Sequence, residues 1–162
     1  MPIYMQFDGI DGESTAAGFE KAVEVLSVQW GATNPGALGS ASGGAGAGKA
    51  SFEDLHIQTN FQSSSPQLFE NLVSGKEIGN ATLSFVKVAA GALNTYLMYK
   101  LSEVFVTSYE TAAAEGSNND APTDDIGLAF GQIEIIYSPP NSDGTLATAI
   151  QAGWDILRNV EP

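Results

Sequence analysis

Residues 21–33 read KAVEVLSVQWGAT, and this stretch decides the class of the fold. Apolar and polar residues alternate here, as they do in a strand with one buried face, first at Val23 and Val25. The alternation then slips by one residue. The apolar positions that share the new phase are Leu26, Val28 and Trp30. A β-bulge explains the slip, because it inserts one extra residue into a strand.

The same slip occurs again between residues 126 and 137. Ile126, Leu128 and Phe130 share one phase, and after Gly131 the apolar positions continue in the other phase at Ile133, Ile135 and Tyr137. Two long bulged strands predict a strongly curved sheet that can close into a barrel.

Further segments of alternating residues are separated by turn-forming clusters, a pattern typical of a sandwich or barrel. The first cluster contains Asp8, Gly9, Asp11 and Gly12. We expect seven or eight strands in all. The others are predicted over 3–7, 52–59, 81–88, 96–109 and 153–160, the last paired with 145–150.

One helix interrupts the strands. Ser65 can cap its start, Pro66 suits the first helical position, and Gly75 supplies a left-handed stop. One apolar face of this helix should pack on the outside of the barrel. That face consists of Leu68, Phe69, Leu72 and Val73. The predicted fold is therefore mainly β: a β-barrel of two curved antiparallel sheets with one flanking α-helix and a long glycine-rich loop.

Two loops stand out. Residues 34–50 are rich in glycine and far longer than a hairpin needs. No charge occurs from residue 25 to residue 48, which favours an arm ordered against another chain over a disordered loop. Residues 111–125 carry Glu115, Asp120, Asp124 and Asp125 and are expected to form a mobile acidic tip.

The length and composition of the chain argue against several classes of partner and of functional site. At 162 residues, the chain is expected to be a single domain spanning 1–162. Its formal net charge of -13 argues against nucleic acid and anionic lipid as partners. No secretory leader and no apolar run long enough to span a bilayer is evident, so we expect a chain that is soluble when made and does not insert in membranes. It has no cysteine, and therefore no thiolate nucleophile or cysteine metal ligand.

The sequence contains only weak matches to patterns that are typical of catalytic or nucleotide-binding sites. The stretch from Gly43 to Lys49 has the spacing of a phosphate-binding loop, but Ala50 stands where that motif needs Ser or Thr, and a strand is predicted to follow. His56 could pair with Asp54 on the same side of a strand, although a solvated surface pair explains both residues. We therefore predict no enzyme activity, no cofactor and no metal site.

Several motifs, in order along the whole chain, resemble the haemolysin-coregulated protein (Hcp) family, which forms the inner tube of the type VI secretion system. They are residues 8–14 (DGIDGES), Trp30-Gly31, Gly48-Lys49, Phe52, Asp54, Leu55, Thr59, Ser65-Pro66, Ser74-Gly75-Lys76, residues 153–156 (GWDI) and Asn159.

The resemblance implies six-membered rings that stack into a hollow tube. A contracting sheath propels this tube with its spike and cargo into a target cell, so that the protein is itself secreted. It also implies that small effectors are held in the lumen, and that the glycine loop reaches a neighbouring subunit. The residues given this assembly role are Gly39, Gly43, Gly44, Gly46, Gly48 and Lys49.

Ser27 and Gln29 alternate with the apolar residues of their strand, so we expect them on a surface that lines the lumen or contacts another subunit. Two alternatives stay open. One is an effector-binding ring or carrier that builds no tube. The other is the tail-tube protein of a phage-like injection particle.

Overall fold

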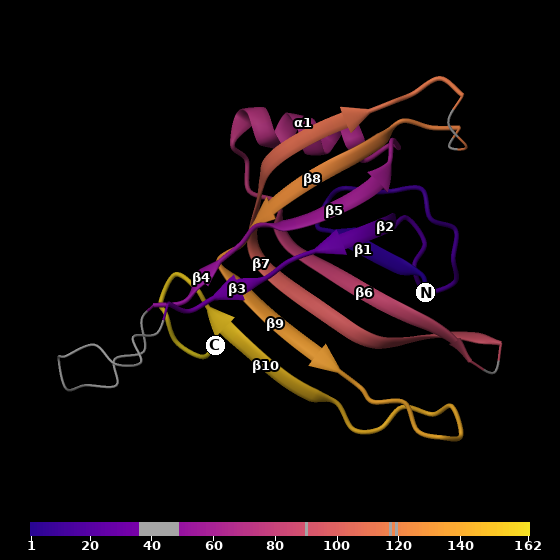
Figure 1. Ribbon diagram of the computed structural model, residues 1–162, viewed down its shortest axis with the longest axis vertical. Helices are drawn as coiled ribbons and strands as arrows, with labels where there is room; N and C mark the ends of the chain where they lie inside the picture. The colour runs from indigo at the N-terminus through magenta and orange to yellow at the C-terminus, as the bar shows by residue number, and fades with distance from the viewer. Residues whose placement is uncertain (36–48, 90, 117, 119) are drawn as a thin grey trace.

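The computed structural model describes residues 1–35, 49–89, 91–116, 118 and 120–162 (Figure 1). Within these ranges the chain forms ten strands and one helix. The elements are β1 (Ile3–Phe7), β2 (Val23–Gln29), β3 (Ala32–Thr33), β4 (Ser51–Phe52), β5 (Leu55–Asn60), α1 (Ser65–Ser74), β6 (Gly79–Ala89), β7 (Ala92–Ala112), β8 (Thr123–Ala129), β9 (Gln132–Tyr137) and β10 (Ile150–Asp155).

Six of the strands close into a barrel. Strand β8 pairs with both β5 and β7, so the order β7-β6-β1-β2-β5-β8 returns to its start. Strands β9 and β10 continue the sheet from β7 beyond the barrel (Figure 1). The predicted fold class is confirmed: the protein is mainly β, with a barrel of curved antiparallel sheet and one flanking helix.

Strand β7 joins the two parts of this sheet. It is 21 residues long, and residues 97–102 pair with β9 whereas residues 105–112 pair with β8. The register shifts between Val106 and Ser108, and Glu103 adopts a positive φ of 54°. These irregularities bend β7 at the point where it changes partner, because a bulge increases the local twist of a strand.

The bulge predicted within residues 21–33 is confirmed. The register of β2 against β5 shifts between Val25 and Ser27. The side chain of Leu26 does not point inward as expected, however, since this residue is 51% exposed. Leu26 is the inserted residue, and the inward phase resumes at Val28, which packs against the core.

The second predicted bulge is wrong. Residues 126–137 belong to two strands, β8 and β9, which are separated at Phe130 and Gly131. The backbone N–H of Gly131 donates to the carbonyl of Ser102, 2.9 Å away, and so holds the chain against β7 where it passes from one strand to the next. A change of strand alters the phase of the alternation in the same way that a bulge does.

Three other boundaries differ from the prediction. The segment expected over 52–59 is divided into β4 and β5, and β10 ends at Asp155. Beyond β10, Val160 forms only an isolated bridge with Asp155. Of the strand predicted over 145–150, Leu146 forms a bridge with Pro140 and Ile150 begins β10. Strand β10 pairs with β9, and not with residues 145–150 as expected.

The interior of the barrel is apolar. The largest fully buried side chains come from every barrel strand, with Leu68 added by the helix. They include Met5, Val23, Leu55, Ile57, Leu83, Val104, Ile126 and Leu128. Strand alternation therefore directs one face of each barrel strand into this core. A second, smaller cluster of Tyr4, Ala22 and Val86 is buried outside it.

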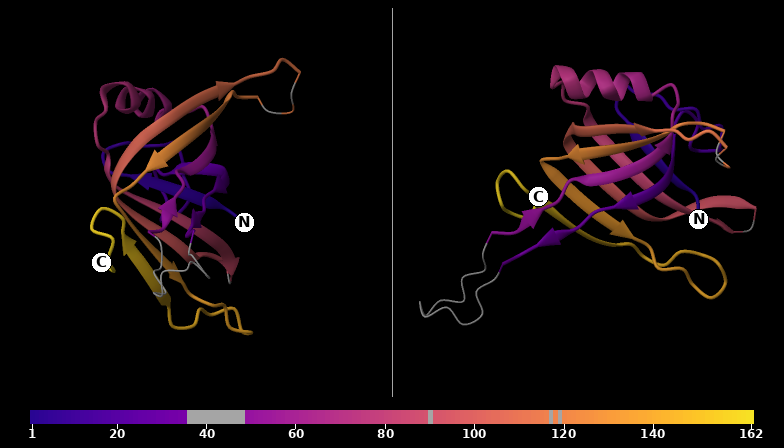
Figure 2. Two further views of the ribbon diagram at one scale, coloured as in Figure 1. Left: turned by 60° about the vertical axis from the view of Figure 1, so that its left-hand side comes forward. Right: turned by 45° about the horizontal axis from the view of Figure 1, so that its top comes forward.

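The helix lies outside the barrel and packs on β7 (Figure 2). Gly75 ends it with φ 69°, as predicted. The start differs by one residue, because Ser64 takes the capping position and makes no side-chain capping bond. Only part of the predicted apolar face is covered. Leu68 is fully buried and Leu72 packs against the core, whereas Phe69 and Val73 are 50% and 66% exposed.

The predicted acidic tip is shorter than expected. Strand β7 continues to Ala112 and β8 begins at Thr123, so Asp124 and Asp125 belong to a strand. Asp124 is fully buried. Its carboxylate accepts hydrogen bonds from the hydroxyls of Ser65 at 2.6 Å and Thr111 at 2.9 Å. An acidic residue is tolerated there because two donors satisfy it.

The hydroxyl groups of two tyrosines should make the free energy of unfolding depend on pH in the alkaline range. Burial raises the pKa of the Tyr4 and Tyr109 hydroxyls above the ordinary value of 10.0, and nearby Glu24 and Asp124 respectively add to the effect. The fold thus favours the neutral phenol. The stability gained is fully present below pH 10.0, where the unfolded chain titrates, and is lost as the pH rises towards the folded-state pKa.

Urea unfolding between about pH 9 and pH 11 should therefore give a falling free energy of unfolding. The double variant Tyr4→Phe/Tyr109→Phe should show a shallower fall. Equal slopes for the two proteins would contradict this assignment.

Candidate functional site

Strands β2, β5 and β8 and the second half of β7 form one curved sheet. Along β5 the alternation is strict: Leu55, Ile57 and Thr59 are buried, whereas His56 and Gln58 are exposed on the outer face. Ser27 and Gln29 of β2 are exposed beside them, because Ser27 pairs with Gln58 and Gln29 pairs with His56. The structure thus brings both predicted site residues to one outward face.

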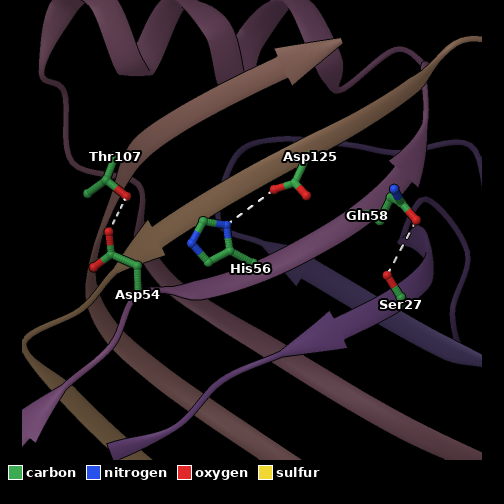
Figure 3. Close-up of polar contacts among 6 residues, drawn as sticks. All are labelled: Ser27, Asp54, His56, Gln58, Thr107 and Asp125. Atoms are coloured by element: carbon green, nitrogen blue, oxygen red, sulfur yellow. Dashed lines mark hydrogen bonds and ion pairs between the residues drawn. The ribbon is translucent and has the colours of Figure 1, made fainter. Parts of the chain in front are cut away.

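Polar contacts connect the strands across this face (Figure 3). The Ser27 hydroxyl lies 3.5 Å from Gln58 Oε1, at the limit of a hydrogen bond. His56 Nδ1 lies 3.2 Å from Asp125 Oδ1 on β8. The two side chains of that pair are 45% and 48% exposed, so the contact is solvated and contributes little to stability.

His56 does not pair with Asp54, although the sequence left that pairing possible. Asp54 precedes β5, and its carboxylate accepts a hydrogen bond of 2.7 Å from the Thr107 hydroxyl on β7 (Figure 3). His56 instead faces the neighbouring strand β8, where Asp125 provides the carboxylate. The spacing along one strand could not reveal this cross-strand partner, because it depends on the register between β5 and β8.

A groove of about 730 Å³ lies on this face. Its lining residues are Gln29, Glu53, Asp54, His56, Ser108, Glu110 and Asp125. We call it the polar groove. Gly127 pairs with His56 in the register of β5 and β8, and a side chain at this glycine would collide with Ser108 and press on the His56 ring. The glycine therefore leaves room for His56 to lie close to the sheet.

The groove exposes hydrogen-bonding and negatively charged groups. Within the described ranges, no three histidine or carboxylate side chains converge closely enough to hold a metal ion. The arrangement is suited to recognising a surface by charge and hydrogen bonds. Sequence reasoning found Gln29 but missed Ser108, Glu110 and Asp125, although the alternation along β7 and β8 could have placed them on the outer face.

The described residues include only the base of the predicted glycine loop. Gly39, Gly43, Gly44, Gly46 and Gly48 lie outside the described residues, whereas Lys49 is described and exposed. The short strands β3 and β4 pair at the base of the loop and point away from the barrel (Figure 1). The pairing of this two-stranded stem was not predicted from the sequence.

Trp30 fixes the stem to the barrel. Its ring centroid lies 6.5 Å from that of Phe52 on β4, 6.1 Å from Tyr99 on β7 and 6.2 Å from Phe130. Aromatic contacts of this kind bury large surfaces and restrict orientation. The direction in which the stem leaves the barrel is therefore set by core packing.

In the described part of the chain, α1 is the one helix, and it is neither long nor apolar enough to span a membrane.

Comparisons with known proteins identify the family to which this fold belongs. Residues 4–137 match the family model described as "Type VI secretion system effector, Hcp". Protein hcp1 of Pseudomonas aeruginosa is 31% identical over 114 residues, which cover 70% of this chain and 69% of that protein. A solved structure of a type six secretion system protein superposes with a TM-score of 0.92 at 29% identity and covers 99% of both chains. Hcp1 from Salmonella typhimurium superposes with a TM-score of 0.81 at 27% identity, covering 99% of this chain and 98% of that one. The chain belongs to the Hcp family of the type VI secretion system.

Proposed function

We propose that this Hcp protein is a structural subunit of the inner tube of a type VI secretion system. Six copies form a ring, rings stack into a hollow tube, and the tube carries small effectors and the spike into a target cell. The observation that carries this proposal is the family match together with a likeness to a type six secretion system protein over 99% of the chain.

The surface of the isolated chain supports an assembled state. Apolar side chains on several elements stay open to solvent, among them Val73, Val88, Ile150 and Leu157, which are 66–71% exposed. Only 15% of the residues are charged, against about 25% in an ordinary soluble domain. Surfaces of this composition gain free energy when neighbouring subunits cover them.

The proposal assigns places to the residues predicted from the sequence. Ser27 and Gln29 line the lumen together with the polar groove, and the loop between β3 and β4 contacts a neighbouring subunit. Partners are further copies of the chain, the sheath, the spike and small effectors. The protein is made in the cytoplasm and leaves the cell through the secretion machine.

Light scattering of the purified chain at moderate salt tests the assembly. The expected mass is six times the 16.9 kDa of one chain, or a multiple of that value for stacked rings. A mass of 16.9 kDa at all concentrations would contradict assembly by the chain alone.

A substitution in the proposed lumen tests the placement of Gln29. We expect Gln29→Arg to reduce retention of a lumen cargo several-fold while rings still form, since a long charged side chain would project from an exposed strand position. The readout is cargo co-purified per ring, with ring mass measured on the same sample. Gln67→Arg on the exposed face of α1 is the matched control and should retain cargo normally. Normal retention by Gln29→Arg would contradict the lumen placement.

A further inference from the structure

We infer that the polar groove selects partners with a basic surface, so that the cargo of this tube is cationic where it touches β2, β5, β7 and β8. This inference rests on the proposed function, because it takes the outer face of these strands as the lumen. It adds a chemical class of partner to that assignment.

The charge of the groove is of one sign. Glu53, Asp54, Glu110 and Asp125 contribute four carboxylates to its lining, and no lysine or arginine is among the lining residues. The one histidine of the lining contacts Asp125 at 3.2 Å. All six basic residues of the chain lie elsewhere in the sequence: Lys21, Lys49, Lys76, Lys87, Lys100 and Arg158.

These carboxylates remain open to a partner. Asp54 accepts one hydrogen bond from Thr107, and Asp125 contacts His56, which leaves acceptor capacity on both. Glu53 and Glu110, the other two carboxylates of the lining, are exposed. Lysine and arginine side chains are the natural partners, and a guanidinium can bind a carboxylate through two parallel hydrogen bonds.

The dimensions favour a protein surface over a single ion. A groove of about 730 Å³ is large enough for several side chains. A metal ion would need three ligands around one point, and the described residues offer no such group. In the same lining, Gln29 and Ser108 supply uncharged donors and acceptors, as expected of a surface that binds a partner through both hydrogen bonds and charge.

Assembly into a ring would strengthen the attraction between the polar groove and a basic partner. Each copy repeats the same groove, so a ring of like copies surrounds its lumen with carboxylates whose potentials add. A basic partner would gain from many weak contacts, whereas each contact alone would contribute little.

The test uses cytochrome c, a small basic protein with a visible haem absorption, and its fully succinylated form as an acidic probe of the same size. The groove variant is Asp54→Asn/Glu110→Gln/Asp125→Asn. The matched control is Glu20→Gln/Glu70→Gln/Glu77→Gln, which removes three exposed carboxylates that do not line the groove. Both variants change the net charge equally.

We expect wild type and control to bind cytochrome c alike at low salt, and the groove variant to bind about tenfold more weakly. The succinylated probe should bind none of them. The single variant His56→Lys places a fixed positive charge beside Asp125 and should weaken binding in the same direction. Equal weakening in the groove variant and the control, or no binding to wild type, would overturn the inference.

Ring mass measured on the same samples separates the two claims. Rings that do not prefer the basic probe would contradict the inference and leave the tube assignment intact. Absence of rings would contradict the tube assignment, and the comparison of the two triple variants would still decide whether the groove selects basic surfaces.

Discussion

Replacing Asp124 with alanine is expected to lower the free energy of unfolding by about 3 kcal/mol. Asp124 is fully buried, and its two oxygens accept hydrogen bonds from Ser65 on α1 and Thr111 on β7. Hydrogen bonds to a charged group contribute roughly 1.5–3 kcal/mol each, and removal of the carboxylate leaves the buried Ser65 hydroxyl without this acceptor. The measurement is urea unfolding at neutral pH.

The neighbouring residue provides the control. Asp125 lies next to Asp124 on β8 but points to the outer face, where it makes the solvated contact with His56. Asp125→Ala should cost less than about 1 kcal/mol, as expected for an exposed pair. Similar losses for the two variants would contradict a specific role for Asp124 in fastening the helix to the barrel.

Alanine at Gly12 should cost about 3 kcal/mol, because the added methyl group would overlap backbone atoms and not flexible side chains. A Cβ at this position would collide with the carbonyl oxygen of Ala22, and would lie 2.7 Å from its carbonyl carbon and 2.8 Å from Val23 Cα. Neither residue can move aside easily, since both are 1% exposed and Val23 begins β2. The Gly12 N–H also donates to the Lys21 carbonyl at 2.7 Å, so the two segments are held close together.

Gly18→Ala is the matched control in the same loop. Gly18 has a positive φ of 82° but nothing within 4 Å of an added Cβ, so only the conformational cost of about 1 kcal/mol is expected. Thermal or urea unfolding measures the stability that each variant loses. If Gly12→Ala is as stable as Gly18→Ala, the loop from β1 to β2 can shift to accommodate the methyl group, and the prediction is wrong.

The barrel was predictable from the sequence because alternation reports directly which face of a strand is buried. Val23, Val25 and Val28 indicated a bulge in β2, and the register confirms it. The phase change after Phe130 has the same appearance in the sequence but arises from a change of strand. Only the pairing of β8 and β9 with different parts of β7 distinguishes the two cases, and pairing is a long-range property.

The positions of two acidic residues also could not be predicted from local sequence patterns. Asp124 and Asp125 looked like part of one mobile loop, because charged residues near Ser and Asn are typical of exposed tips. In the structure they point to opposite faces of β8, one fully buried beneath α1 and one in the polar groove. The hydroxyl donors that make burial of Asp124 possible are 13 and 59 residues away, so local patterns could not reveal them.

Of the candidate site, Ser27 and Gln29 followed from alternation, and the structure places both on the outward face. Asp125 is brought to His56 by the register of β5 against β8. The long glycine-rich loop was predicted from composition and length, and its assembly role from its lack of charge and from the family resemblance. The described residues include only β3, β4 and Lys49 beside it.

Electron cryomicroscopy of the purified chain at moderate salt tests the central claim most directly. We expect rings of six copies with a central hole, in which β2, β5 and β8 face the lumen and their polar groove opens into it. Rings in which this sheet faces outward, or single chains without a hole, would contradict the proposed tube.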